Sequence, residues 1–347
     1  MSSEIIKRPI IAVTMGDPSG VGPEISAMVL ADLKIYGKCR PLIVGSPAVM
    51  ERALTYTRHT ELKINTISDV KDALFTHGVI DVFDVGTGNM LPEPGVVNAP
   101  AGDMAFRSIE KTIELAMAGE VDATVTNPIN KEAINMAGHH YAGHTEIYAH
   151  YTNTSKYSMM LAHGDFRVIH VSTHVSLKKA CELVTKDRVL NCIRIADMTC
   201  KNLGIEKPKI AVAGLNPHCG EAGMFGTEEI DEICPAVAAA REEGIDVDGP
   251  IAADTVFSKA IGGLYDTVVA MYHDQGHIPM KVKGFVFDPV KKEWGTVSGV
   301  NISCGLPIIR TSVDHGTAMG HAGKGNANSL SLHDAMEYAI KLAQNRW

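Results

Sequence analysis

The sequence has 347 residues, a formal net charge of -8 and 45% hydrophobic residues. With roughly 150 residues per domain as a guide, this length predicts two lobes with a cleft between them. The acidic balance argues against a nucleic-acid partner, and no apolar run in the sequence reaches the ~20 residues of a membrane helix.

The N-terminal stretch MSSEIIKRPIIAV has an apolar run too short for a signal peptide, so we expect a cytoplasmic protein. The seven cysteines form no C-x-x-C pair and lie within apolar segments. We therefore expect buried free thiols.

Short apolar runs alternate with amphipathic stretches, which is typical of parallel strands joined by helical crossovers in an α/β fold. The clearest predicted strands are 10–15, 41–44, 79–85, 123–126, 168–172, 210–214 and 267–271. The clearest predicted helices are 104–118, 186–203, 230–243 and 333–344.

Ligands of such folds collect beyond the carboxyl ends of the strands, so the residues after each strand are the first candidates. These residues include GDPSGVGPE at 16–24, NPINKE at 127–132, and three motifs that carry His174, His218 and His273. Three predicted strands thus each bring a histidine to one edge of the sheet.

Neutral imidazole is a common ligand of divalent metals, and catalytic sites often use three protein ligands. One such histidine alone would be read as hydrogen-bonded to backbone, but three at equivalent positions favour a metal site. Asp254 and Asp274 could orient the imidazoles, although Asp254 is also a plausible helix N-cap. His277 could share a helix face with His273, while Gly276 favours a loop or a helix start between them.

The cations near these motifs could meet an acidic substrate. Lys281 follows the last histidine motif, and Asn301 and Arg310 flank another strand-like run. The glycines of GDPSGVGPE match no nucleotide fingerprint and could simply permit positive φ. The long polar stretch 314–330 is expected to be a functional loop.

Eight ordered motifs together resemble the 4-hydroxythreonine-4-phosphate dehydrogenase family. They are TMGDPSGVGPEI, TNPINKEAI, GHTEIYA, STHVSL, GLNPHCGE, ADTVF, YHDQG and GVNISCGLPIIRTSVDHGTA. The stretch HGTAMGHAGKGNAN is also similar to the cofactor loop of isocitrate and isopropylmalate dehydrogenases, whose two-lobed α/β/α fold the resemblance implies. We expect residues 1–126 and 305–347 to form the cofactor-side lobe, and 127–304 to form the lobe for metal, substrate and dimerisation.

The resemblance implies a homodimer with its active site at the subunit interface, and it assigns roles to individual residues. The metal ligands would be His174, His218 and His273, the third donated by the partner subunit. The substrate would bind His144, Thr145, Lys281, Asn301 and Arg310, with Asp254 and Asp274 beside the metal. NAD would bind Asp314, His315, Gly316, Thr317, Gly323 and Asn326.

The path from Lys281 to GVNI is longer than the family pattern, which indicates a short insertion beside the substrate site. This resembles the branch acting on D-threonate or D-erythronate 4-phosphate. A bound cation (zinc first, then magnesium, manganese or cobalt) would make the C3 hydroxyl easier to oxidise by NAD. Lys281, Asp274 or Asp254 would accept the hydroxyl proton. Decarboxylation of the product would then yield dihydroxyacetone phosphate and CO₂.

Three alternatives remain open at this point. The chain could instead oxidise 4-hydroxy-L-threonine 4-phosphate in pyridoxal phosphate synthesis. It could be a non-redox acyl-phosphate transferase, which needs no metal and ignores NAD. It could also be a protein that binds a phosphorylated acid without transforming it.

Overall fold

The computed structural model describes residues 8–290 and 293–346, and for residues 293–297 it describes the backbone alone. The chain forms two compact units: one ends at Ser155 and resumes at Leu306, and the other runs from Lys156 to Gly305. The first division thus falls later than the predicted boundary at residue 126. The N-terminal stretch considered for an export signal lies partly outside the described residues.

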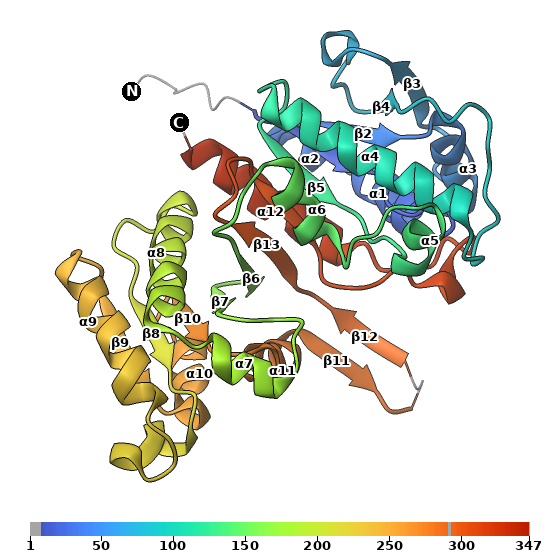
Figure 1. The fold of residues 1–347 in the computed structure, drawn as a ribbon. Helices are drawn as coiled ribbons and strands as arrows, with labels where there is room; N and C mark the ends of the chain where they lie inside the picture. Colours follow the sequence, from blue (N-terminus) through green and yellow to red (C-terminus); the bar gives the residue numbers. More distant parts are fainter. Residues whose placement is uncertain (1–7, 291–292, 347) are drawn as a thin grey trace, which may run out of the picture. The chain divides into compact units, whose positions relative to one another are not determined.

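The first unit is built on a parallel sheet (Figure 1) whose strand order is β3-β4-β2-β1-β5-β14. Its strands are β1 (Ile10–Thr14), β2 (Arg40–Gly45), β3 (Lys63–Ile67), β4 (Val79–Asp84), β5 (Ala123–Thr126) and β14 (Arg310–Val313). Its helices are α1 (Gly22–Leu30), α2 (Leu33–Lys38), α3 (Pro47–Thr57), α4 (Ala99–Met117), α5 (Lys131–Met136), α6 (His144–Tyr151) and α12 (Leu330–Asn345), with short 3₁₀ turns η1 (Val70–Asp72) and η4 (Met319–His321).

The second unit has a mixed sheet with the order β13-β6-β7-β10-β8-β9, in which β13, β6 and β7 pair antiparallel and the rest parallel. Its strands are β6 (Ser158–His163), β7 (Phe166–His170), β8 (Ile210–Ala213), β9 (Val247–Ile251), β10 (Thr267–Ala270) and β13 (Val300–Cys304), with a separate hairpin of β11 (Phe285–Asp288) and β12 (Glu293–Val297). Its helices are α7 (Leu177–Leu183), α8 (Lys186–Asn202), α9 (Cys234–Glu242), α10 (Ala253–Ile261) and α11 (His273–Gly284), with the 3₁₀ turn η2 (Pro217–Gly223) and the π turn η3 (Glu229–Ile233).

The α/β class is confirmed, and each predicted strand is present with small shifts of its ends. The helix predicted at 230–243 begins with the π turn η3 before α9. The specific likeness to isocitrate and isopropylmalate dehydrogenases stays a prediction. Among the described residues, no helix combines the length and apolar character that a membrane crossing requires.

Helices α5 and α6 belong to the first unit because they pack on α4. A Cβ added at Gly102 of α4 would lie 2.1 Å from the carbonyl oxygen of Ala133 in α5, so only glycine permits this approach. Phe106 and Ile109 of α4 share a buried cluster with Tyr148 of α6. This packing places the start of α6, and therefore His144, within the first unit.

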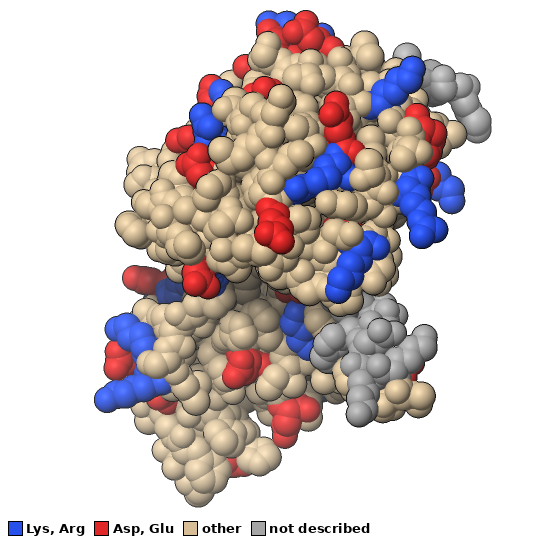
Figure 2. Space-filling view, turned by 90° about the vertical axis from the view of Figure 1, so that its right-hand side faces the viewer, with Lys and Arg blue, Asp and Glu red and all other residues tan. Residues whose placement is uncertain are grey.

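All seven cysteines are free thiols, as predicted. Cys39, Cys192, Cys200 and Cys304 are buried, whereas Cys234 is exposed. On the face drawn in Figure 2, Lys and Arg side chains lie interspersed with Asp and Glu over the part of the surface that is described.

Candidate active site

Three neighbouring strands bring the predicted metal ligands to one edge of the second unit's sheet. Strand β10 pairs in parallel with β7 on one side and with β8 on the other, so their carboxyl ends lie together. His174 follows β7, His218 lies in η2 after β8, and His273 begins α11 after β10. The sequence prediction of a shared edge is confirmed.

The ring of His273 is oriented by its neighbours. Its Nδ1 lies 2.7 Å from Oδ1 of Asp274, a carboxylate oxygen that accepts the Nδ1–H, so this tautomer leaves Nε2 for a ligand. The ring of His277 stacks on it, with centroids 3.6 Å apart, and His277 Nδ1 donates to the His273 carbonyl at 2.9 Å. Asp274 and His277 therefore fix both the tautomer and the plane of His273.

A buried histidine, His170, packs against the first turn of α11, which carries this pair. His170 lies 1% exposed at the end of β7, and burial lowers its pKa to about 3, so the ring is neutral. Its Nδ1 donates to the Met159 carbonyl at 3.3 Å, and a Cβ at Gly276 would lie 2.3 Å from its Nε2. Gly276 thus lets the first turn of α11 pass directly over His170, which explains a glycine at a helix start.

His218 lies in an unusual backbone segment. The residues from His218 to Ala222 all have left-handed φ, a conformation that costs free energy in non-glycine residues. Buried Glu229 fixes the residues just before this segment. Its Oε1 accepts the amide N–H groups of Leu215 and Asn216, both at 2.7 Å. The side chain of His218 is exposed.

The three histidines do not form a complete ligand set within the described part of this chain. The rings of His174 and His273 lie 5.7 Å apart between centroids, but no group of three His, Cys, Asp or Glu side chains among the described residues is placed to hold a metal ion. The tautomer of His273 fits metal binding, and His174 lies close enough to share a ligand with it. His218 does not complete the set here.

The other predicted residues of the second unit lie on α10, α11 and β13. Asp254 is exposed in the first turn of α10, whose N-cap is Ala252, so the N-cap interpretation of Asp254 is wrong. Lys281 Nζ lies 4.0 Å from the ring centroid of Phe285, the first residue of the hairpin. Asn301 Oδ1 is buried and has no hydrogen-bond partner among the described residues, as expected of a group that awaits a ligand.

The first unit contributes a buried cation at the end of its sheet. Arg310, 2% exposed on β14, donates from Nη2 and Nε to Thr126 Oγ1 at 2.7 and 3.2 Å, and its guanidinium lies 5.6 Å from the Tyr148 ring centroid. Burial lowers its pKa to about 10, which still leaves it protonated at neutral pH. A buried guanidinium held by a hydroxyl and an aromatic face suits bidentate recognition of a carboxylate or phosphate.

His144 and Thr145 begin α6, beside Arg310. Burial lowers the pKa of His144 well below its ordinary value, and the charges of Arg310 and Lys131 lower it further, so the ring is neutral. Its Nε2 is buried with no hydrogen-bond partner in the described chain. An unpartnered imidazole nitrogen, a guanidinium and the amide groups of a helix N-terminus together favour an anionic ligand.

The predicted cofactor residues lie on the loop between β14 and α12, where the structure places η4 and otherwise irregular backbone. Asp314 N donates to Ser331 Oγ at 3.1 Å, His315 Nδ1 lies 2.8 Å from the Gly316 carbonyl, and His321 Nδ1 lies 3.2 Å from Asn326 Oδ1. A Cβ built at Gly316 or Gly320 would meet no described atom within 4 Å. This open backbone fits the close approach of a dinucleotide.

Several supporting residues were not predicted from the sequence. Thr126 and Tyr148 contact Arg310, His277 stacks on His273, and His170 lies against His277. Asp17, in the turn after β1, is 1% exposed, and burial raises its pKa, while its Oδ2 has no hydrogen-bond partner among the described residues. Thr126 ends a predicted strand, and Asp17 lies in the stretch 16–24 that the strand-end rule had already named, whereas the ring stacking leaves no sequence signal.

Known proteins match almost the whole chain. The family model "Pyridoxal phosphate biosynthetic protein PdxA" matches residues 37–339. The chain is 47% identical over 335 residues to a D-threonate 4-phosphate dehydrogenase of Pectobacterium atrosepticum, covering 96% of this chain and 99% of the relative. It is 45% identical to a D-threonate 4-phosphate dehydrogenase of Salmonella typhimurium, covering 96% of this chain and 98% of the relative.

Among solved structures, the chain is similar to a 4-hydroxythreonine-4-phosphate dehydrogenase from Klebsiella pneumoniae. The TM-score is 0.84 and the identity 44%, and the match covers 96% of this chain and 99% of that one.

Proposed function

The chain belongs to the family described as pyridoxal phosphate biosynthetic protein PdxA, and from this premise we propose that it oxidises D-threonate 4-phosphate at C3. NAD, when bound, would supply the hydride acceptor, and a 3-keto acid formed in this way would lose CO₂ to give dihydroxyacetone phosphate. The observation that carries the proposal is the 47% identity, over 96% of the chain, to a relative named for this substrate. D-Erythronate 4-phosphate is the closest alternative within the same chemistry.

The buried groups of the first unit support an anionic substrate. Arg310 supplies a buried positive charge, and neutral His144 offers a ring nitrogen without a partner among the described residues. Thr145 lies in the same first turn of α6. These groups would hold the substrate's phosphate or carboxylate and so align C3 for hydride transfer.

His174, His218 and His273 would hold a divalent cation, with zinc preferred and magnesium, manganese or cobalt as alternatives. Such a cation, when bound, supplies Lewis-acid polarisation of the substrate hydroxyl and carboxylate oxygens. Asp274 accepts a hydrogen bond from Nδ1 of His273, and this leaves Nε2 of the same ring available to the cation. No three ligands lie together within the described residues of one chain, and we propose that two copies share the set, with His273 donated by the partner subunit.

The substrate's hydroxyl proton needs an acceptor on this chain. Asp274 already accepts from His273, so its role is to orient the imidazole. Lys281 and Asp254 are therefore the better candidates for the base, and Asn301 would hydrogen-bond the substrate through its buried amide.

An apolar surface on the second unit supports a homodimer. Ile278 and Val282 of α11 are 60% and 78% exposed, and they line a groove with Phe257 and Ile261 of α10. Asp254 and Asp274 line the same groove. A second copy that covered these side chains would bring its own residues next to the proposed metal ligands.

An NADH-release assay with D-threonate, D-erythronate and 4-hydroxy-L-threonine 4-phosphates, each with added Zn²⁺, Mn²⁺, Co²⁺ or Mg²⁺, tests the proposal. We expect NADH from D-threonate 4-phosphate with the highest kcat/KM. A preference for the amino substrate would instead assign the chain to pyridoxal phosphate synthesis, a candidate favoured by the name of the similar Klebsiella pneumoniae structure. Tight binding of the acids without NADH would favour a transferase or a binding protein.

A further inference from the structure

The glycine-rich segment 16–24 after β1 has no role in the function proposed above, yet it ends in a buried carboxylate. Glu24 lies in the first turn of α1 and is 2% exposed. We propose that Glu24 is a positioning residue that fixes the loop 314–328 in the shape that receives the dinucleotide. This inference rests on the proposed NAD-dependent function.

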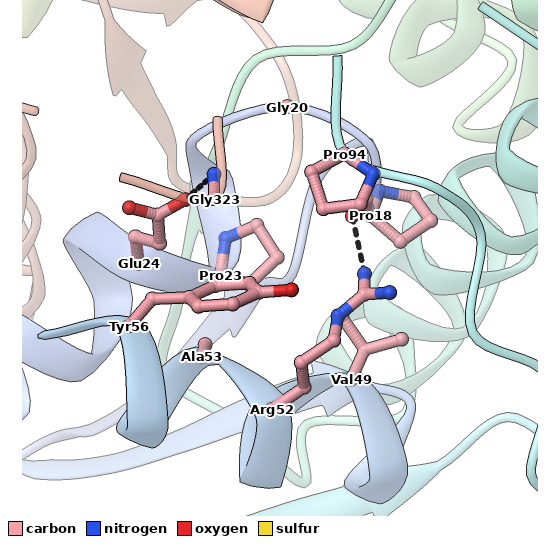
Figure 3. Close-up of a pocket in the computed structure, with 10 residues that line it drawn as sticks. All are labelled: Pro18, Gly20, Pro23, Glu24, Val49, Arg52, Ala53, Tyr56, Pro94 and Gly323. Carbon is pink, nitrogen blue, oxygen red and sulfur yellow. Dashed lines mark hydrogen bonds between the residues drawn. The ribbon is translucent and has the colours of Figure 1, made fainter. Parts of the chain in front are cut away.

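Both oxygens of Glu24 bond to that loop. Oε1 accepts the amide N–H of Gly323 at 2.5 Å, a contact drawn in Figure 3, and Oε2 accepts the amide N–H of Gly325 at 2.7 Å. A carboxylate that accepts two backbone N–H groups in a buried place makes charge-assisted bonds, which are stronger than bonds between neutral groups. Glu24 therefore sets the distance between the loop and α1.

The same glycine-rich segment holds the loop at a second point. Val21 N donates to the Thr317 carbonyl at 3.0 Å, and a Cβ at Gly20 would lie 2.9 Å from that same oxygen. The loop is thus fixed at Thr317 and again at Gly323 and Gly325. Between the two points lies Gly320, whose backbone is open.

The small pocket beside Glu24 has no room for a ligand. Its volume is about 10 Å³, which is space for one water at most, and Figure 3 shows Pro23, Tyr56 and Pro94 among the residues that line it. The guanidinium of Arg52 donates hydrogen bonds to the carbonyls of Pro92 and Pro18, at 2.6 and 3.1 Å. The region therefore supports the loop and does not itself bind the cofactor.

The loop also packs closely against α3 at Gly325. Gly325 has φ +63°, and a Cβ there would lie 2.0 Å from the Tyr56 carbonyl oxygen of α3. Residues proposed to bind the acid, such as His144 and Arg310, lie on other elements of the unit. A change at Glu24 should therefore act on dinucleotide affinity far more than on acid affinity.

The test is Glu24→Gln, which keeps the shape of the side chain but replaces one accepting oxygen by an NH₂ group. This group faces one of the two glycine N–H groups, so that hydrogen bond is lost. We expect the KM and the Kd for NAD to rise about tenfold, the loss expected for one charge-assisted hydrogen bond. The KM for D-threonate 4-phosphate should stay within about twofold, because the acid's binding groups are untouched. Glu51→Gln, an exposed change of the same charge on α3, is the matched control.

Limited trypsin digestion gives a second readout that needs no activity. Lys324 lies between the two bonded glycines and is exposed, so Glu24→Gln should speed cleavage after Lys324 while Glu51→Gln leaves its rate unchanged. Equal increases in both KM values, or an unchanged NAD affinity with unchanged cleavage, would overturn the proposal. If wild-type protein forms no NADH, the proposed function fails while the digestion still tests the contact.

Should Glu24→Gln not fold, Glu24→Asp serves instead, because it keeps the charge and withdraws it by one methylene. We then expect a smaller rise of the NAD Kd in the same direction and faster cleavage after Lys324. Unchanged values for this variant would count against the role of Glu24.

Discussion

At the scale of single residues, the candidate site depends on burial that sets protonation. Arg310 stays charged although it is 2% exposed, and His144 stays neutral beside it. The pair offers a fixed cation and an uncharged ring nitrogen at the same place. An acidic substrate bound there, as proposed, would meet one positive charge and one neutral hydrogen-bonding group.

The neutral state of His144 predicts a pH dependence of stability. Its folded pKa lies below its unfolded value near 6.5, so the unfolded chain binds more protons below that pH. The stabilisation is complete above pH 6.5 and decreases as pH falls, by up to about 1.4 kcal/mol per pH unit. Urea unfolding of wild type and His144→Leu at pH 7.5 and 5.5 measures it. Equal losses in both proteins would contradict the assignment.

Replacing Arg310 by lysine should separate geometry from charge. Lysine keeps a positive charge but cannot reproduce the two donors to Thr126, or the fork that a phosphate or carboxylate accepts. We expect the KM for the phosphorylated acid to rise about tenfold or more, with little change in the KM for NAD. Arg107→Lys, an exposed change on α4, is the control in the same steady-state assay.

At the level of the elements, the strand-end rule placed the candidate histidines at a shared sheet edge because the direction of neighbouring strands decides where the residues that follow them meet. His174 and His273 come together since β7 and β10 are parallel neighbours, and alternating apolar runs signal both strands. Strand β3 went unpredicted because partly exposed residues such as Lys63 and Asn65 hide its period. Helix α11 contains Gly276 and Pro279, which weaken the sequence signal for a helix. The glycine in its first turn is explained by the close packing of this turn on His170, which a sequence does not show.

The hairpin β11–β12 begins at a residue that contacts a proposed catalytic cation. Lys281 Nζ lies 4.0 Å from the Phe285 ring centroid, a cation–π distance that holds the ammonium group in place. Phe285→Leu should therefore lower kcat/KM for the phosphorylated acid about five- to thirtyfold, which corresponds to ~1–2 kcal/mol. Phe285→Tyr should restore it.

Phe287→Leu provides the control for this hairpin, since Phe287 is 50% exposed on the same strand. A kcat/KM equally reduced by Phe287→Leu would show that the hairpin as a whole matters and not the ring beside Lys281.

At the scale of the whole molecule, one described chain does not bring three ligands to a single metal position. The rings of His174 and His273 lie 5.7 Å apart between centroids, but no group of three possible ligands lies together among the described residues. A sequence cannot show this, because ligand assembly depends on how copies associate. The resemblance to a family of shared-site dimers is what predicts the missing partner.

Mixing two inactive variants tests whether subunits share the site. If His218 and His273 of one site come from different chains, refolding His218→Ala together with His273→Ala gives mixed dimers in which one of the two sites is intact. We expect roughly a quarter of wild-type activity after random pairing. No recovered activity, with dimers formed, would show that each site takes both histidines from one chain.

In the proposed function, this chain couples oxidation of D-threonate 4-phosphate to loss of CO₂. The direct measurement is a product balance in which NADH, CO₂ and dihydroxyacetone phosphate are each quantified against D-threonate 4-phosphate consumed. We expect equal amounts of NADH, CO₂ and dihydroxyacetone phosphate. Absence of NADH, or NADH with a stable phosphorylated keto acid and no CO₂, would contradict it.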